Sequence, residues 1–169
     1  MARVEAHSLP YRPCVGIMLV NDAGQVWIGN RTGFDNGETG ETWQMPQGGI
    51  DEGEAPHVAA LRELKEETGT DKAEIVAETT DWINYDLPEE LVGIALKGKF
   101  RGQTQRWFLL RFTGRDSDID IAADDHQEFS EWRWADIDEL TELIIPFKQP
   151  VYEKVVAEFR DMVKSITNT

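Results

Sequence analysis

The sequence contains a single cysteine, Cys14, with no cysteine or histidine partners at a metal-binding spacing. An intrachain disulfide and a cysteine-based zinc site are therefore excluded. Cys14 lies in the apolar run of residues 14–20, so we expect it to be a core residue.

Long apolar runs are also absent. No run approaches the ~20 residues that cross a bilayer, and residues 1–10 lack the apolar core of a signal peptide. No repeat, low-complexity tract or proline-rich linker divides the 169 residues. We expect one domain over residues 1–169, located in the cytoplasm and without a membrane partner.

Positive charge is scarce, because 17 lysines and arginines face 32 acidic residues and leave a formal net charge of −15. This balance argues against duplex DNA and anionic lipid as partners, so any nucleic-acid contact must be local. Residues 96–115 are the exception, because they carry six basic residues and no acid. This basic run indicates either a solvated strand edge or a binding surface for polyphosphate. Its members are Lys97, Lys99, Arg101, Arg106, Arg111 and Arg115.

Short β-rich runs dominate the first two-thirds of the chain. Residues 14–20 and 25–28 predict two strands joined by a turn at Asn21-Asp22-Ala23-Gly24. Residues 32–42 are glycine-rich and polar and predict a loop. Further strands are expected over residues 43–46, 74–80, 82–86, 92–96, 105–113 and 128–134.

Helical periodicity occurs in three places. The first helix begins near Pro56 and ends at Gly69, and a shorter one covers residues 136–143. Pro150 opens a third helix, whose apolar stripe consists of Val151, Val155, Phe159, Met162, Val163 and Ile166. Strands with interspersed helices predict an α/β (α+β) fold with a mixed sheet that carries helices on its faces.

The first helix carries Glu63, Glu66 and Glu67 on one arc of ~100°. Val58, Leu61 and Leu64 fall on the opposite side and are expected to pack on the sheet. A solvated charged face would have basic partners, but Arg62 and Lys65 are expected to point elsewhere on the helical wheel. Like charges at this spacing, partly in the last helical turn, are unfavourable. The pattern therefore indicates a missing cation, and carboxylate ligands suit Mg²⁺, Mn²⁺ or Ca²⁺.

The flanking residues extend this pattern over residues 48–70. Gly48 and Gly49 are expected to adopt a backbone conformation closed to other residues, and Gly69 to end the helix. The segment resembles the Nudix box: glycine, five residues, glutamate, seven residues, then Arg-Glu-hydrophobic-any-Glu-Glu-any-Gly-hydrophobic. Thr70 departs from the last position. The matching residues are Gly48, Glu54, Arg62, Glu63, Leu64, Glu66, Glu67 and Gly69.

The resemblance to Nudix hydrolases implies a fold, a cofactor and a reaction. It implies a mixed β-sheet sandwiched between helices, and more than one Mg²⁺ or Mn²⁺ ion held by Glu63, Glu66, Glu67 and the Gly48 carbonyl. Arg62 would hold the loop through an ion pair with Glu54. The metal ions would assist water in cleaving a phosphoanhydride bond. Glu66, or otherwise Glu128, would take the proton from the water.

Blocks outside the box extend the resemblance over residues 11–159. They are similar to the branch of the family that contains bacterial RNA pyrophosphohydrolases and plant-type diadenosine polyphosphate hydrolases. They include residues 11–16, 43–49, 105–108, 128–134 and 146–148. The implied substrates are the 5′-triphosphate end of RNA, whose cleavage initiates mRNA decay, or a dinucleoside polyphosphate.

The same branch implies site residues beyond the box. Glu128 would be a fourth acidic metal ligand, Arg12, Arg31 and Lys148 would contact phosphates, and Phe147 would stack on a base. Without the resemblance, Phe147 is as well explained as a core residue and the two arginines as surface residues. We assign Trp132 and Trp134 to the core.

Three other functions are less consistent with the sequence. A Nudix-fold isomerase would need cysteine chemistry that Cys14 does not provide. A non-catalytic binding module would have lost an acidic ligand, and a Ca²⁺ buffer would need an EF-hand loop. The polar insertion of residues 33–42 is a candidate determinant of RNA against diadenosine tetraphosphate, and the sequence indicates no protein partner.

Overall fold

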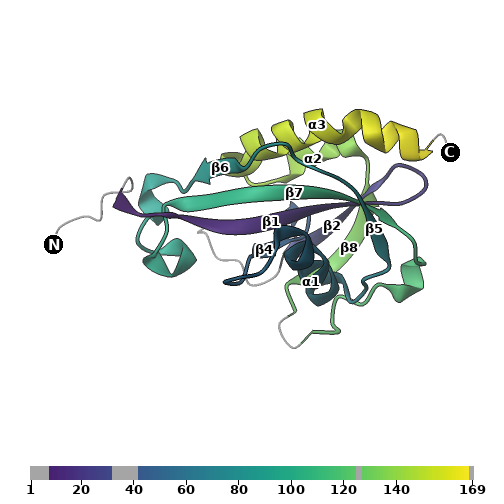
Figure 1. Cartoon of the computed structure of the whole chain (residues 1–169), viewed down its shortest axis with the longest axis horizontal. Helices are drawn as coiled ribbons and strands as arrows, with labels where there is room; N and C mark the ends of the chain where they lie inside the picture. The colour runs from purple at the N-terminus through teal and green to yellow at the C-terminus, as the bar shows by residue number, and fades with distance from the viewer. Residues whose placement is uncertain (1–7, 32–41, 125–126, 168–169) are drawn as a thin grey trace.

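An eight-stranded sheet forms the centre of the computed structural model, which describes residues 8–31, 42–124 and 127–167 (Figure 1). The strands are β1 (Tyr11–Val20), β2 (Val26–Arg31), β3 (Trp43–Gln44), β4 (Gln47–Gly49), β5 (Ala73–Glu78), β6 (Ile83–Asp86), β7 (Gly102–Phe112) and β8 (Phe129–Ala135). The helices are α1 (Pro56–Thr68), α2 (Leu140–Leu143) and α3 (Gln149–Thr167). Short 3₁₀ turns are η2 (Glu89–Leu91), η3 (Ala95–Gly98), η4 (Asp116–Asp118), η5 (Ile137–Glu139) and η6 (Pro146–Lys148).

The sheet is mixed, as predicted. Strand β1 pairs in parallel with β7 over its whole length, and all other pairings are antiparallel. Strand β4 pairs with β1, strands β5 and β6 pair with β7, and strands β3 and β8 pair with β2. The run from Cys14 to Val20 is buried throughout, as expected for a strand covered on both faces.

Helices cover both faces of the sheet (Figure 1). Alternate residues of β1 face opposite ways, so Val15, Ile17 and Leu19 pack in one core with α1. Met18 and Val20 pack in a second core with α3. The predicted sandwich of a mixed sheet between helices is therefore confirmed, and its two cores lie on either side of β1 and β7.

Helix α1 begins and ends where the sequence predicts. Pro56 occupies its first turn, where a missing N–H costs nothing, and Gly69 ends it in the left-handed conformation with φ 79°. The prediction for its apolar face was partly wrong. Leu64 is buried together with Ala59 and Ala60, whereas Val58 is 48% exposed. Two alanines thus make the contact that the hydrophobic pattern assigned to Val58.

Most other elements agree with their predictions to within a few residues. The turn after β1 is present, with Gly24 at φ 77°. In α3 the stripe of Val151, Val155, Phe159 and Val163 is buried, while Met162 is 40% exposed at its edge. The loop predicted over residues 32–42 lies outside the described residues, apart from Thr42.

The strand predicted over residues 92–96 was wrong, since η2 and η3 occupy this part of the chain. Gly93 and Gly98 have φ values of 87° and 69°, and Leu96 and Lys97 also have positive φ. A backbone that repeatedly enters the left-handed region cannot extend as a strand. Of the apolar residues that suggested the strand, Val92, Ala95 and Leu96 pack partly buried against the core, and Ile94 is exposed.

The basic run of residues 96–115 does not follow a sheet edge. Its central part belongs to β7, which lies between β1 on one side and β5 and β6 on the other. Arg101 pairs with Asp86 at 3.0 Å and Arg106 with Glu78 at 3.4 Å. Arg111 also pairs with acidic side chains.

Among the described residues, no helix combines the length and apolar character needed to cross a membrane.

Truncation of Leu64 tests the observed packing of α1. Leu64→Ala removes a fully buried side chain and should lower the free energy of unfolding by about 2–5 kcal/mol. Val58→Ala is the matched control on the same helix and should change it by less than about 1 kcal/mol. Denaturant unfolding followed by circular dichroism measures both. Equal losses for the two variants would contradict this orientation of the helix.

Candidate active site

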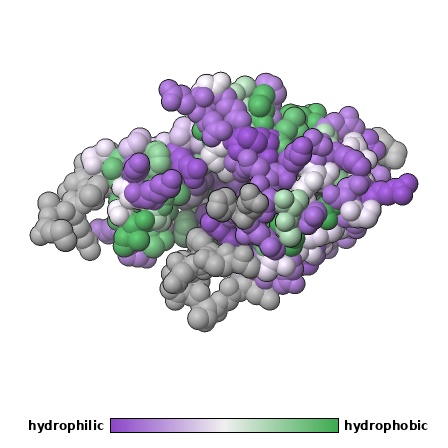
Figure 2. All heavy atoms as spheres, turned by 90° about the horizontal axis from the view of Figure 1, so that it is seen from below, coloured by the Kyte–Doolittle hydropathy of each residue, from purple (hydrophilic) through white to green (hydrophobic). Residues whose placement is uncertain are grey.

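A cavity of about 770 Å³ opens beside α1, between the sheet, the segment 87–96 and the turn η6. Its size is ordinary for a small-molecule or nucleotide site. Figure 2 shows a hollow on this face, bordered by hydrophilic residues and by an apolar patch. The apolar lining of the cavity includes Leu87, Leu91 and Ile94, of which Ile94 is 74% exposed. The cavity thus combines a polar floor with an apolar rim.

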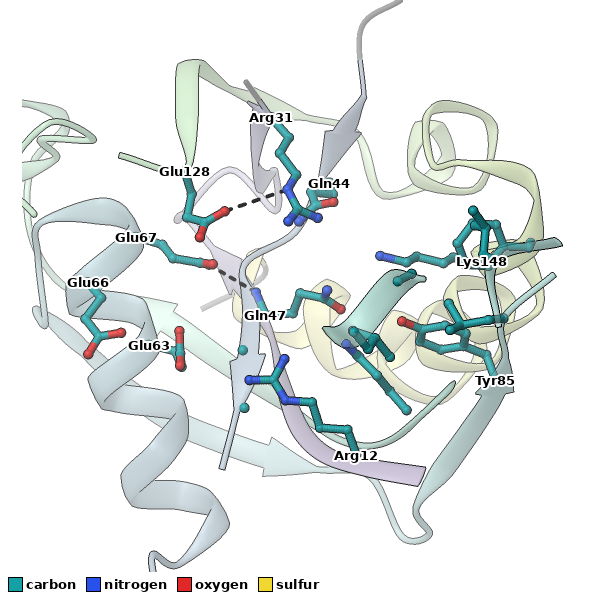
Figure 3. A pocket seen from close by; sticks show the side chains of 18 of the residues that line it. Arg12, Arg31, Gln44, Gln47, Glu63, Glu66, Glu67, Tyr85, Glu128 and Lys148 are labelled. Carbon is teal, nitrogen blue, oxygen red and sulfur yellow. Dashed lines mark hydrogen bonds and ion pairs between the residues drawn. The ribbon is translucent and has the colours of Figure 1, made fainter. Parts of the chain in front are cut away.

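The acidic residues of α1 line one wall of this cavity, as Figure 3 shows. Glu67 is only 5% exposed, and the Gln47 N–H donates to its Oε2 at 3.0 Å. Burial, with the charges of Glu63 and Glu128, raises the pKa of Glu67 well above its usual range. Burial also raises the pKa of Glu63 to about 7. The acids expected on this face of α1 therefore line one cavity, and burial disfavours the charged forms of Glu63 and Glu67.

Arg62 holds this wall to the loop that precedes the helix. Its Nε and Nη2 atoms each donate to Glu54 at 2.8 Å, and Nη2 also donates to the Gly49 carbonyl at 2.9 Å. The Glu54 contact matches the ion pair that the resemblance implied. The expectation that Arg62 points away from the acidic arc was wrong, because Nη1 lies 2.9 Å from Glu63 and 3.3 Å from Glu66. Arg62 and Glu66 are spaced i and i+4 and are therefore neighbours on the helix surface.

Gly48 allows close approach of a side chain and does not adopt a special backbone conformation. A Cβ atom at position 48 would lie 2.0 Å from Cδ of Glu63, and one at position 49 would lie 2.4 Å from Nη2 of Arg12. Neither glycine is among the residues with positive φ, so the expected special conformation was wrong. The two glycines instead allow an acidic side chain and a basic side chain to lie against strand β4.

Basic side chains line the same cavity as these acids. Arg12, on β1, and Lys148, in η6, project toward the cavity in Figure 3. Arg31, at the end of β2, lies 3.7 Å from Glu128, and both residues line the cavity. All the acidic and basic side chains expected at the site therefore meet around one cavity.

Lys148 is an unusual cation because it is 7% exposed. Its Nζ lies 5.7 Å from the Tyr85 ring and 5.9 Å from the Phe147 ring, and within the described residues it forms no ion pair. Burial, followed by the charge of Arg31, lowers the pKa of Lys148 to about 8. Such an ammonium group favours an anion in the cavity.

Phe147 lines the cavity, whereas the basic residues of the run 96–115 do not. Phe147 is half-buried, packs 5.8 Å from the Tyr85 ring and lines the cavity, so it contributes both to packing and to the cavity wall. None of the six basic residues of the run 96–115 lines the cavity. The basic run, considered as a binding surface for polyphosphate, is therefore not part of this site.

Several lining residues were not singled out from the sequence. Gln44, Gln47, Gln103 and Tyr85 contribute polar groups to the cavity, and Gln44 and Gln103 are each 4% exposed. Gln47 immediately precedes Gly48, and Gln103 continues the alternation of polar residues along β7. Buried glutamines at alternate strand positions would have been the available signal.

The chemistry of these groups fits a divalent cation. The donors are carboxylate oxygens, two of which have raised pKa values because they are buried close to like charges. Within residues 8–31, 42–124 and 127–167, however, no three ligating groups are already gathered as a metal site. The guanidinium of Arg62 between Glu63 and Glu66 explains this, since it satisfies two of the acids in the place of a metal ion.

Cys14 takes no part in such chemistry. It is fully buried, and burial raises the pKa of its thiol to about 11. The thiol therefore stays protonated and unreactive at neutral pH. This agrees with its predicted place in the core.

Comparisons with known proteins were made for the sequence and for the fold. A model of the NUDIX domain matches residues 10–159. An RNA pyrophosphohydrolase of Wolbachia pipientis is 54% identical over 154 residues, which cover 91% of this chain and 92% of that protein. An RNA pyrophosphohydrolase of Agrobacterium fabrum is 53% identical over 165 residues, covering 94% and 97%.

Solved structures support the same assignment of the fold. The dihydroneopterin triphosphate pyrophosphohydrolase of E. coli is similar with a TM-score of 0.64 at 19% identity, covering 88% of this chain and 99% of that one. A C. elegans Ap4A hydrolase complex is similar with a TM-score of 0.62 at 17% identity, covering 89% and 98%. Together with the box of residues 48–70 and the cavity built on it, these matches show that the chain belongs to the Nudix family of hydrolases.

Proposed function

We propose that this protein is a Mg²⁺-dependent pyrophosphohydrolase that removes pyrophosphate from the 5′-triphosphate end of RNA. The observation that carries the proposal is one cavity lined both by four glutamates and by the cations Arg12, Arg31 and Lys148. Relatives at 53–54% identity are named RNA pyrophosphohydrolases, and the matches cover nearly the whole chain. In a cell this reaction would initiate mRNA decay. A dinucleoside polyphosphate hydrolase remains the alternative to be tested.

The acidic wall would hold the metal ions. Glu63, Glu66, Glu67 and Glu128 and the Gly48 carbonyl are the proposed ligands, and more than one Mg²⁺ or Mn²⁺ ion would bind. These ions would neutralise phosphate oxygens and activate water. Binding requires Nη1 of Arg62 to release Glu63 and Glu66, while Nε and Nη2 can keep Glu54 in place.

The remaining residues would bind the substrate and move one proton. Arg12, Arg31 and Lys148 would hold the phosphate groups, and Phe147 would stack on a base. Water would attack phosphorus in line with the leaving pyrophosphate and break the α–β anhydride bond. Glu66, or Glu128 in its place, would accept the water's proton. The products would be a 5′-monophosphate end and pyrophosphate.

Glu67→Gln tests the acidic wall through stability as well as activity. Because the folded pKa of Glu67 is raised, the native state binds more protons than the unfolded state above about pH 4.5. The stability of the metal-free protein should therefore fall as pH rises from about 5 to 8. The variant should lose part of this slope and melt a few degrees higher than the wild type at pH 8, while hydrolysis is abolished. Differential scanning calorimetry without metal, then with Mg²⁺, measures this.

The control for this experiment is Glu52→Gln, in the exposed loop before α1. It should behave like the wild type in every measurement. Mg²⁺ should raise the melting temperature of the wild type and of Glu52→Gln but not of Glu67→Gln. Full activity of Glu67→Gln, or full wild-type activity in excess chelator, would contradict the metal-dependent mechanism.

The substrate is tested by comparing hydrolysis of 5′-triphosphorylated RNA with that of diadenosine tetraphosphate at equal concentration. We expect a higher kcat/KM on the RNA, with pyrophosphate and monophosphorylated RNA as products. Phe147→Ala should reduce kcat/KM on RNA by roughly tenfold, the loss of one stacking contact. Faster cleavage of diadenosine tetraphosphate would favour the alternative. A lower melting temperature with unchanged kinetics would assign Phe147 to packing alone.

Lys148 should make substrate binding pH-dependent. Because burial lowers its pKa to about 8, the free enzyme loses this positive charge between about pH 7 and 9. KM for triphosphorylated RNA should therefore rise over this range. Lys148→Met should have a KM that is roughly tenfold higher at pH 7 and lacks this rise. Lys164→Met, at an exposed position of α3, is the control and should keep the wild-type profile. An unchanged KM in Lys148→Met would refute the role.

A further inference from the structure

A row of hydrogen-bonded side chains runs along β7 from the core into the cavity. Gln103, Gln105 and Trp107 alternate along the strand and so project from the same face. Gln105 joins Gln103 to Gln47 of strand β4. Gln47 and Gln103 line the cavity, whereas Trp107 is 1% exposed beneath them. We call Trp107, Gln105, Gln103 and Gln47 the amide relay.

The direction of every hydrogen bond in the amide relay follows from Trp107. An indole N–H can only donate, so the Gln105 atom 2.8 Å from Nε1 must be the oxygen Oε1. The other end of the Gln105 amide is then the NH₂ group, which lies 2.9 Å from Gln47 and 2.7 Å from Gln103. Both contacts must be made by the oxygens of those side chains. The chemistry of one indole thus settles the orientation of three amides.

Two NH₂ groups remain for the cavity. With both Oε1 atoms engaged by Gln105, Gln47 and Gln103 present their Nε2 atoms as donors. Among the described residues neither Nε2 atom has a hydrogen-bond partner, although Gln103 is only 4% exposed. Gln47 is half-buried and Gln103 buried, and donors at a cavity wall without a protein acceptor favour an acceptor supplied from the cavity.

The direction of the hydrogen bonds in the amide relay is fixed, because Trp107 at its inner end is held in the core. A Cβ atom at Gly16 would lie 2.3 Å from the Trp107 ring, so the indole packs directly on strand β1. Its other side meets the Tyr152 ring edge-on at 5.7 Å. Register places Gln103 beside Arg12, and Gly16 beside both Trp107 and Gln47. Gln103 therefore lies next to a basic residue, and Gln47 lies next to Glu67, to which its backbone N–H donates at 3.0 Å.

We propose that Trp107 and Gln105 are positioning residues that fix Gln47 and Gln103 as hydrogen-bond donors to the phosphate oxygens of the substrate. The proposal rests on the proposed function and deepens it. A phosphate chain at neutral pH offers acceptors almost exclusively, which matches a pair of fixed donors. The edges of purine bases mix donors with acceptors, so they fit such a pair less well. Gln44 also lines the cavity, but in the part of the chain that the structure describes its side chain has no hydrogen bond that fixes its orientation.

Trp107→Phe tests the root of the amide relay, since it keeps an aromatic ring and removes the N–H. Gln105 is then free to turn, and the two donors are no longer held. KM for 5′-triphosphorylated RNA should rise roughly three- to tenfold, while kcat changes less than about twofold. Trp134→Phe makes the same chemical change where the indole donates to Asp116 instead, and should leave both constants unchanged.

Gln105→Glu reverses the amide relay. A carboxylate only accepts, so Gln47 and Gln103 should turn their NH₂ groups toward it and their oxygens toward the cavity. KM should exceed that of Trp107→Phe, giving the order wild type and Trp134→Phe, then Trp107→Phe, then Gln105→Glu. A kcat loss at unchanged KM in Trp107→Phe, or kinetics equal to those of Trp134→Phe, would overturn the proposal.

A binding measurement on the wild type separates this proposal from the proposed function. Inorganic tripolyphosphate with Mg²⁺ should shift the side-chain amide resonances of Gln47 and Gln103 in ¹H–¹⁵N spectra. The amide of Gln149, which donates to the Thr141 carbonyl, should not shift. Unmoved Gln47 and Gln103 resonances at saturating tripolyphosphate would overturn the role of the amide relay. Shifted resonances in a protein that does not cleave triphosphorylated RNA would refute only the proposed function.

Discussion

The Arg62 guanidinium makes the contact on which the site depends. It ties helix α1 to the preceding loop through Glu54 and to strand β4 through the Gly49 carbonyl, at distances of 2.8–2.9 Å. The same group reaches Glu63 and Glu66. Two paired N–H bonds to one carboxylate fix both distance and orientation. This tie adds a polar link to the apolar packing of Ala59, Ala60 and Leu64 that holds α1 against the sheet.

Glu63 and Arg12 pack closely against strand β4, and together they form part of the cavity wall. Because positions 48 and 49 lack side chains, Glu63 lies against one glycine and Arg12 against the other. Acidic and basic groups can then approach the same three-residue strand. Burial of the acids disfavours their charged forms, and the high pKa of Glu67 records this cost. A divalent cation or a proton relieves it, which links the packing of the helix to the proposed chemistry.

Local patterns in the sequence were sufficient wherever a single element decides the outcome. The limits of α1 follow from Pro56 and Gly69, and the parallel core strands follow from continuous apolar runs. The predictions were wrong where contacts with residues distant in sequence decide the burial or the backbone conformation. Val58 fits the apolar face of a helical wheel but is exposed, and residues 92–96 have strand-like composition but a left-handed backbone. Periodicity reports which face a residue occupies, but not how closely the sheet approaches that face.

The sequence by itself determined the acidic arc of Glu63, Glu66 and Glu67, because the arc depends on spacing along one helix. The resemblance of residues 48–70 to the Nudix box implied the family and the mixed sheet between helices. Only the tertiary structure decided how Arg62 is shared between the loop and that arc. It also decided that Lys148 is buried opposite the acids and that Trp107 sets the polarity of Gln47 and Gln103. Hydrogen-bond direction and burial depend on groups far apart in sequence, so no local pattern contains them.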